Sequence, residues 1–458
     1  MDTLIDGIKK TIEKLENAIE QGNPSIIANK ADVFLPIGPG KYSNEIEWSK
    51  VYSSVVHKIY GKKNRLYDFN VWKKNILDEL SKDRKTKDIV NVLSEIYLGP
   101  EALKKITPLA YLFSSDDVKM NEKTKSIINL FHSMILYEKF DLDELYGNNF
   151  LEKLLISKIN DNLIDKYEDD EEKNSYLPFL SKFFTEDLRV LLCNTQLFLK
   201  EFETFLKLYS FLYLSQLSLH LEIQPFSVPK SEKLYFILES ERASKERINP
   251  NMYGYYSIFG KNKSAYKLFP YLSYLTRLNS SYEKNYLPLW KIFEIVKSSE
   301  KYDEFYYSLN KMNLLFNKLY EIKLDNQKHY ESIKDLLEYS LELQLDIFYK
   351  SNKNSKREGA NQHVVNTFKE KYCDGFYKLK GPSGYFFELK PNIIMLLTKL
   401  IIGKAGTMLI DDVIQGFRDR GIWLDEQSKK ALIIFYERIG NVEKMSDSGD
   451  AVYVKSEI

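Results

Sequence analysis

Glycine and proline are scarce in this chain of 458 residues, which contains 19 Gly and 13 Pro. Together they make up about 7% of the residues, whereas ordinary usage gives about 12%. Because β-sandwiches and barrels need many turns, the shortage argues against them and favours long helices. The two cysteines, Cys193 and Cys373, could form at most one disulfide and cannot build a structural zinc site, which fits a reducing cytoplasm.

An excess of charge of one sign is also lacking, since 66 Lys and Arg nearly balance 65 Asp and Glu. The chain therefore has no global basic field that would attract nucleic acid or an anionic membrane, and any contact with nucleic acid must be local. The first twenty residues hold no apolar stretch for a signal peptide, and charged or polar residues interrupt the most apolar windows, 205–221 and 393–402. We expect a cytoplasmic protein with no membrane partner.

Signatures of covalent or metal-dependent catalysis are nearly absent. The five histidines form no His-x-His or His-Glu-x-x-His pair, neither cysteine lies in a nucleophile signature, and there is no Gly-x-Ser-x-Gly elbow. The turn at 38–41 lacks the glycine spacing and the Ser or Thr that a phosphate-binding loop requires. We therefore predict no cofactor, no metal and no catalytic activity of the chain by itself.

One pattern is compatible with a nuclease. Asp374 is followed, after a Gly-Pro turn, by Glu388 and Lys390, which is the order found on adjacent strands of metal-dependent nucleases. In those enzymes two carboxylates hold a divalent ion and the lysine assists the attacking water. The Glu-x-Lys spacing also occurs at 171–173 and 321–323, as chance would produce in a chain that is 29% charged. A structural β-hairpin is the simpler interpretation, and a nuclease centre is the alternative.

Apolar residues at helical spacing run through most of the chain. Ile5, Ile8, Ile12, Leu15 and Ile19 recur every three or four residues and predict a helix that ends at Gly22. Helical spacing returns at 72–80, 124–140, 186–223 and 308–349. An acidic run at 168–172 predicts a solvated linker between an N-terminal helical region, 1–167, and a central helical bundle, 174–350.

Tyrosines interleaved with lysines mark residues 248–290. Such a segment could stack on unpaired bases and neutralise phosphates. However, the chain contains 33 Tyr and 27 Phe, so tyrosine is common throughout it. A buried or protein-facing aromatic surface is therefore the favoured interpretation.

The polar tract 351–359 indicates the clearest domain boundary, with a domain at 359–458 after it. In that domain we predict a hairpin, three helices, of which the third is capped by Asp425, and a final hairpin. Their expected ranges are 375–380 with 385–389, then 393–402, 409–420 and 425–439, then 442–444 with 451–454. Three helices and a hairpin are the order of a winged helix. The predicted fold class is mainly α, with a multi-helix body followed by a C-terminal winged-helix-like α+β module.

A DNA-binding winged helix places its third helix in the major groove and its hairpin against the backbone of double-stranded DNA. The candidate DNA-binding residues are Gln427, Lys429, Lys430 and Arg438 on the helix and Lys444 and Lys455 on the hairpin. The domain carries 14 basic and 13 acidic residues, and Asp447 and Asp450 would repel phosphates from the hairpin tip. Contact with DNA and docking on a protein therefore both stay open.

The sequence of the last two elements resembles a known family. The runs Arg420-Gly-Ile-Trp-Leu-Asp-Glu-Gln-Ser-Lys-Lys-Ala-Leu432 and Phe435-Tyr-Glu-Arg-Ile-Gly-Asn-Val-Glu-Lys-Met-Ser-Asp-Ser-Gly-Asp-Ala-Val-Tyr-Val454 are similar to the C-terminus of DptG. DptG is the G subunit of the bacterial three-component, DNA phosphorothioation-dependent restriction system. The match covers about the last 40 residues, and elsewhere the support is similar length and helical character.

The resemblance implies a non-catalytic accessory or scaffold subunit in defence against DNA that lacks the sulfur mark. Its partners would be the F and H subunits of the restriction complex, which are expected to carry nucleotide hydrolysis and translocation. If those subunits hydrolyse the nucleotide, this chain needs no phosphate-binding loop, which agrees with its sequence. The resemblance supplies no catalytic residues, so the candidate site residues depend on the winged-helix prediction alone.

Overall fold

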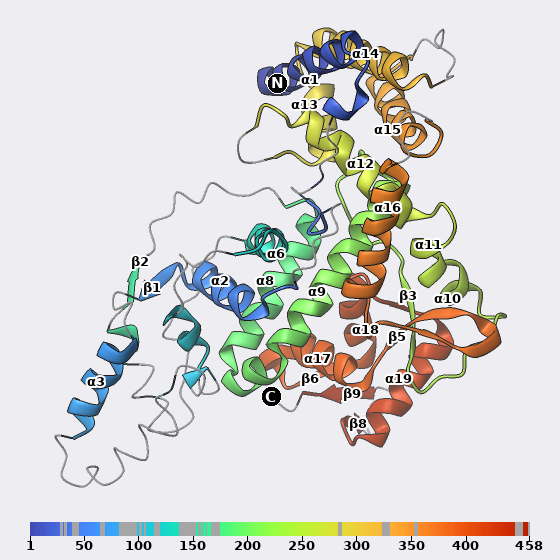
Figure 1. The fold of residues 1–458 in the computed structure, drawn as a ribbon. Coiled ribbons are helices and arrows are strands. Elements are labelled where there is room, and N and C mark those ends of the chain that lie inside the picture. Colours follow the sequence, from blue (N-terminus) through green and yellow to red (C-terminus); the bar gives the residue numbers. More distant parts are fainter. Residues whose placement is uncertain are drawn as a thin grey trace.

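A computed structural model describes most of the chain. The described residues are 1–27, 31, 34–38, 45–64, 69–81, 99, 103, 104, 107–113, 120–136, 153, 157, 159–161, 163–165, 175–282, 286–322, 330–351, 356–444 and 452–456. Helices dominate, and a small mixed sheet region involves the C-terminal part (Figure 1). The prediction of a mainly α body followed by a small α+β region is confirmed. No helix among these residues is long and apolar enough to cross a membrane.

The first helix, α1 (Asp2–Glu20), packs along α14 (Tyr302–Tyr320), which lies far away in the sequence (Figure 1). Its predicted apolar stripe faces this partner, and Ile5, Ile8 and Ile12 are buried. Ion pairs flank the apolar contact, with Lys9 Nζ 2.9 Å from the carboxylate of Glu304. The N-terminal helix therefore completes a bundle whose other members belong to the central part of the chain.

Helices α8 (Pro178–Cys193), α9 (Thr195–Ile223) and α15 (Ile333–Tyr349), together with α14, overlap the two long runs that the sequence predicted as helical. Between those runs lie α12 (Ser264–Leu278) and α13 (Leu289–Lys297), which the sequence did not predict. The run at 186–223 breaks at Asn194, whose side chain accepts a 2.8 Å hydrogen bond from the Leu197 amide and caps α9. The run at 308–349 also forms two helices, because Glu321 adopts a left-handed φ of 51° and ends α14.

Shorter elements make up the described part of the N-terminal region. They are α2 (Trp48–Tyr60), α3 (Phe69–Leu80), α6 (Glu122–Met134) and the antiparallel pair β1 (Lys62–Asn64) and β2 (Leu163–Asp165). Helix α2 packs on α6, and α6 packs on α8. The helices predicted at 72–80 and from 124 are confirmed, whereas 137–140 and the acidic run 168–172 lie outside the described residues.

A four-stranded sheet joins the central part of the chain to the C-terminal part. Its order is β4 (Tyr377–Leu379), β5 (Tyr385–Leu389), β3 (Tyr235–Leu238), β7 (Trp423–Leu424). The predicted hairpin forms β4 and β5, and β3 pairs in parallel with both β5 and β7. Two single-turn helices, α10 (Ile248–Met252) and α11 (Tyr255–Phe259), pack beside β3 and β5. Extensive contacts thus cross the predicted boundary at 351–359.

The polar tract 351–359 is itself partly helical. Helix α16 (Lys356–Thr367) begins inside the tract, and Arg357 is buried with its guanidinium 4.2 Å from the ring centre of Tyr320. The helix then packs against α12 and α15. A tract without large apolar residues can therefore enter the core when one long cationic side chain stacks on an aromatic ring.

The remaining C-terminal elements follow the predicted order. They are α17 (Pro391–Ile402), β6 (Thr407–Leu409), α18 (Ile410–Asp419), α19 (Glu426–Arg438), β8 (Val442–Lys444) and β9 (Val452–Lys455). The last three strands form an antiparallel sheet of order β6-β9-β8. The sequence did not predict β6 or β7. The turn of the last hairpin, 445–451, lies outside the described residues, as do Asp447 and Asp450.

Candidate nucleic-acid interface

Helix α19 lies on the surface with one face in the core. The Asp425 side chain accepts a 2.9 Å hydrogen bond from the Ser428 amide, so Asp425 is the N-cap that the sequence predicted. Ser428, Leu432 and Tyr436, four residues apart, are buried. The opposite side of the helix points to solvent, including Ile434, whose side chain is 47% exposed.

Three of the six candidate DNA-binding residues share this solvent face. Gln427, Lys430 and Arg438 are exposed, and with Ile434 their spacing of three, four and four places them on one stripe of α19. The stripe runs the length of the helix. We name these four residues the α19 face.

The other three candidates do not belong to the α19 face. Lys429 is half-buried and forms an ion pair with Glu426 on the same helix. Lys455, on β9, lies 3.3 Å from the carboxylate of Glu443 on β8. Lys444 belongs to β8, where it pairs in register with Val452. Lys429 and Lys455 thus already have acidic partners within the chain.

The charge of this surface is mixed. The ammonium of Lys429 donates a hydrogen bond to Glu426 and holds the pKa of that carboxyl below its ordinary value. Glu426 and Glu437 are exposed near the ends of α19, and Ile439 is exposed at its C-terminal end. Glu426 also lies four residues before Lys430, whose charge helps to lower the pKa of that carboxyl. Because acidic charge lies next to the α19 face, we expect few phosphate contacts and a modest salt dependence.

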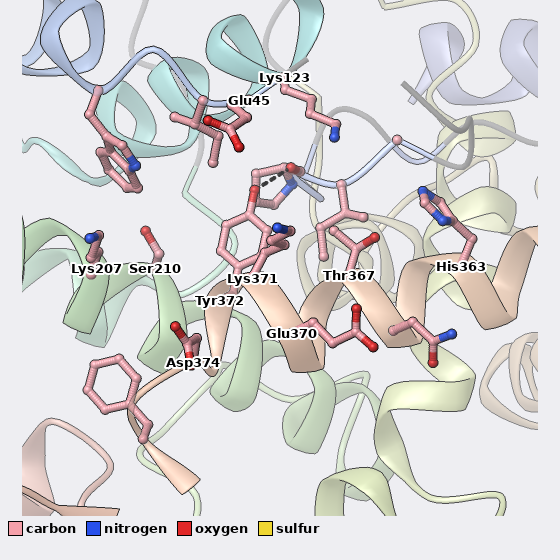
Figure 2. Close-up of a pocket in the computed structure, with 17 residues that line it drawn as sticks. Glu45, Lys123, Lys207, Ser210, His363, Thr367, Glu370, Lys371, Tyr372 and Asp374 are labelled. Carbon is pink, nitrogen blue, oxygen red and sulfur yellow. Dashed lines mark hydrogen bonds between the residues drawn. The ribbon is translucent and has the colours of Figure 1, made fainter. Parts of the chain in front are cut away.

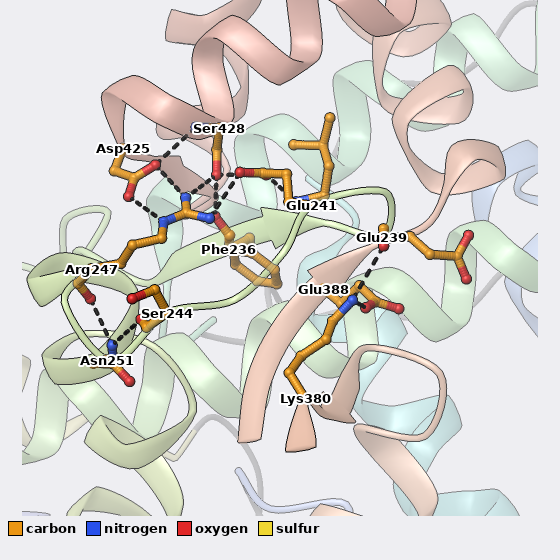
Figure 3. Close-up of polar contacts among 11 residues, drawn as sticks. Phe236, Glu239, Glu241, Ser244, Arg247, Asn251, Lys380, Glu388, Asp425 and Ser428 are labelled. Carbon is orange, nitrogen blue, oxygen red and sulfur yellow. Dashed lines mark hydrogen bonds and ion pairs between the residues drawn. The ribbon is translucent and has the colours of Figure 1, made fainter. Parts of the chain in front are cut away.

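A buried ion cluster fixes the N-terminus of α19 (Figure 3). Arg247 is 7% exposed, and its guanidinium donates to both carboxylate oxygens of Asp425, at 3.0 and 2.5 Å. It also donates to Glu241 at 2.8 Å and to the Ser428 hydroxyl at 2.7 Å. Burial alone would raise the pKa of Asp425, but the hydrogen bonds from Arg247 and Ser428 outweigh it and lower that pKa. The cluster therefore ties α19 to the segment after β3.

A second buried pair fixes the end of α18. Arg420 donates to both carboxylate oxygens of Asp187 on α8, at 2.7 and 2.5 Å, and the Tyr209 hydroxyl donates to the same carboxylate. Burial would lower the pKa of Arg420, yet the Asp187 carboxylate raises it above its ordinary value. The C-terminal module is thus fastened to the helical body by two bidentate arginine pairs.

Glu388, a member of the alternative nuclease site, is already engaged (Figure 3). It is buried on β5, and the ammonium of Lys380 lies 2.5 Å from its carboxylate. Lys380 also donates to the carbonyl of Glu239 at 3.2 Å. A carboxylate that is neutralised by an internal lysine is poorly prepared to hold a divalent ion. Among the described residues, no group of three His, Cys, Asp or Glu side chains could hold a metal.

Asp374 lies in the wall of a cavity of about 670 Å³ that Glu388 does not line (Figure 2). The cavity lies between residues 36–38 and 45–48, α6, α9, α16 and the segment that follows α16, and its wall includes His363, Glu370 and Lys371. Of the three proposed nuclease residues, all of them described, only Asp374 contributes to this wall. The wall mixes acidic and basic side chains, so its charge selects no ligand class.

Arg247 and Arg420 were missed by sequence reasoning. Each lies far along the chain from its carboxylate partner, 178 residues for Asp425 and 233 for Asp187. A single sequence holds no signal that links such positions. Comparison with known proteins does not identify the chain either: no protein-family model matches it, and no curated protein matches it.

Proposed function

We propose that this chain is a non-catalytic accessory subunit of a DNA phosphorothioation-dependent restriction complex and that it engages double-stranded DNA through the α19 face. The observation that carries the proposal is the connectivity of the last domain. Apart from the short strand β7, a helix, a strand, two helices and a hairpin follow one another, and the strand β6 pairs with the last strand, β9. This order supports a winged-helix interpretation, in which α19 would be the recognition helix.

The side chains of the α19 face can make the contacts that the major groove of DNA offers. Lys430 and Arg438 can contact phosphates or guanine edges, and Gln427 can pair with adenine. The exposed Ile434 between them can contact a thymine methyl group. All four side chains lie on the side of the helix that carries no core residue.

The accessory role rests on the resemblance to DptG and on the chemistry of the described residues. The F and H subunits would supply nucleotide hydrolysis, and this chain would connect them to DNA. The alternative, a metal-dependent nuclease using Asp374, Glu388 and Lys390, is weakened by the ion pair of Glu388 with Lys380. In this proposal, the two arginine pairs give the helical body a fixed orientation relative to the DNA.

A DNA titration across a salt series tests the proposal. We expect Lys430→Glu/Arg438→Glu to weaken binding of a duplex at least tenfold at low salt and to reduce the salt slope by roughly 2, one for each lost phosphate contact. The matched control is Lys10→Glu/Lys14→Glu on α1, at the opposite end of the molecule (Figure 1), where both lysines are exposed. Equal affinity of the α19 variant and the control variant would refute the role of the α19 face.

A cleavage assay addresses the alternative. The purified chain is incubated with duplex DNA and Mg²⁺ or Mn²⁺, and we expect no cleavage. Cleavage that disappears in Glu388→Gln, with DNA binding unchanged, would establish the nuclease instead.

A further inference from the structure

Helix α10 exposes aliphatic side chains on a single turn. Ile248 is 66% exposed and Met252 is 60% exposed, and their spacing of four places them on the same side of the turn. Tyr253, the next residue, is also exposed. Exposure of aliphatic side chains to water is unfavourable. Several of them together on one side of a turn therefore mark a surface that another molecule can cover.

The exposed patch continues onto α11 and the β4–β5 hairpin. Tyr256 is exposed, and its hydroxyl accepts a 3.1 Å hydrogen bond from the Tyr385 amide. Leu379, 55% exposed, lies opposite Tyr385 in the hairpin register. We name Ile248, Met252, Tyr253, Tyr256 and Leu379 the α10 platform.

The backbone under the α10 platform is held rigidly. Arg247, which precedes Ile248, is anchored in the ion cluster at the N-cap of α19 (Figure 3). The Asn251 side-chain amide donates to the carbonyls of Ser244 and Arg247, at 3.0 and 2.8 Å. The Tyr235 amide of β3 donates to the Tyr253 carbonyl at 2.9 Å. A rigid surface loses little conformational entropy when a partner binds, which is the property expected of a docking site.

Positive charge surrounds the α10 platform. The segments that contain it, 239–263 and 377–380, expose five cations and two carboxylates on their surface, although the whole chain is almost neutral. The exposed cations are Arg242, Lys245, Lys261, Lys263 and Lys378, and the exposed carboxylates are Glu239 and Glu246. A partner segment with acidic residues beside its apolar ones would complement this rim.

Single-stranded nucleic acid would also meet a positive rim, but the platform suits it less. Three of the five platform residues are aliphatic or end in a thioether, and they offer no ring for a base to stack on. The neighbouring rings of Tyr255, Tyr377 and Tyr385 already surround the ammonium of Lys369, 5.2 to 5.8 Å from their centres. The faces of these three rings are thus used within the chain, and of the platform residues only Tyr253 and Tyr256 expose a ring.

We infer that the α10 platform docks an acidic segment of a partner protein that presents aliphatic side chains between its carboxylates. This inference rests on the proposed function, since the partner would be one of the other subunits of the restriction complex. The α10 platform and the α19 face are both anchored by the Arg247 cluster, but they expose different residues. Substitutions can therefore remove partner binding without removing DNA binding, and the reverse.

The test measures binding of the purified F and H subunits to the full chain. We expect Ile248→Asp/Met252→Asp to weaken binding of one subunit at least tenfold, and we expect the wild-type affinity to fall as salt rises. The matched control is Tyr307→Asp/Leu314→Asp, two exposed apolar residues on α14 at the other end of the molecule, which should bind like wild type. Unchanged affinity of the platform variant for duplex DNA shows that it is folded.

The other outcomes overturn the inference in distinguishable ways. If the platform variant binds both subunits like wild type, the docking site is wrong while the DNA titration still supports the proposed function. If wild type binds neither subunit, the docking inference and the assembly role both fail. If the platform mutations instead abolish binding of a single-stranded oligonucleotide, or a self-association seen by light scattering, the occupant is nucleic acid or a second copy of the chain.

Discussion

Helices α10 and α19 both start at the Arg247 ion cluster, yet they expose different chemistry. Helix α19 has 13 residues, a side-chain N-cap and a polar exposed face. Helix α10 has five residues, no side-chain cap and an aliphatic exposed side. Exposed charge costs little on any protein surface, whereas exposed aliphatic groups on a rigid turn are unfavourable until they are covered. This difference is the basis of the proposals that α10 docks a protein and that α19 contacts DNA.

The largest effect is expected from breaking the cluster that both helices share. Arg247→Ala would leave the carboxylates of Glu241 and Asp425, both largely buried, without their cation. Removing one partner of a buried pair costs about 3 to 5 kcal/mol. We expect a loss of that size in the free energy of unfolding in urea, with DNA binding and subunit binding lost together.

Arg242→Ala is the matched control, since Arg242 is exposed five residues earlier. We expect it to change the free energy of unfolding by no more than about 0.5 kcal/mol. A loss below about 1 kcal/mol for Arg247→Ala would mean that the two helices do not depend on the cluster.

As the pH falls, the helical body should lose stability before the Arg247 ion cluster does. His220 on α9 is fully buried, neither ring nitrogen has a hydrogen-bond partner among the described residues, and burial lowers its pKa to about 4. The unfolded chain binds this proton near its ordinary pKa of 6.5, so stability is fully present above that pH and falls as the pH drops toward 4. The loss amounts to roughly 3 kcal/mol.

Denaturation at several pH values measures this loss. His220→Leu should flatten the pH dependence between 6.5 and 4. Across the same interval, Asp425 stays ionised because its pKa is lowered. A slope that survives in His220→Leu would assign the acid sensitivity to another group.

Gly254→Ala should disturb α10 and leave α19 unchanged, so it distinguishes the roles of the two helices. A Cβ at Gly254 would lie 2.2 Å from the carbonyl oxygen of Pro250 and 3.1 Å from that of Tyr235, so the turn of α10 must move. Overpacking of this kind costs about 1 to 3 kcal/mol. We expect subunit binding to fall while affinity for duplex DNA stays unchanged. Gly359→Ala on α16, where the added Cβ meets no atom within 4 Å, should leave subunit binding and DNA binding unchanged.

The sequence predicted α19 and missed α10 for physical reasons. The 3.6-residue period and the cap at Asp425 are local signals, and both are confirmed. Ile248 and Met252 also have helical spacing, but that spacing does not show whether the two side chains are buried or exposed. Their exposure depends on where β3 and Arg247 place the turn of α10. Strand β3 was missed because its partners, β5 and β7, lie far along the chain. The candidate site was thus predictable where one helix forms it and unpredictable where distant segments meet.

The smallest effect should distinguish two adjacent lysines of α19. Lys429 is half-buried and paired with Glu426, whereas Lys430 is exposed on the α19 face. An i,i+3 ion pair on a helix surface contributes only about 0.2 to 0.5 kcal/mol, so neither Lys429→Ala nor Lys430→Ala should change the free energy of unfolding by more than this. Their DNA affinities should differ, because a lost phosphate contact lowers the salt slope by about 0.9. We expect that change for Lys430→Ala and little change for Lys429→Ala. The reverse order would place the flank of α19 that carries Glu426 and Lys429 against DNA, in place of the α19 face.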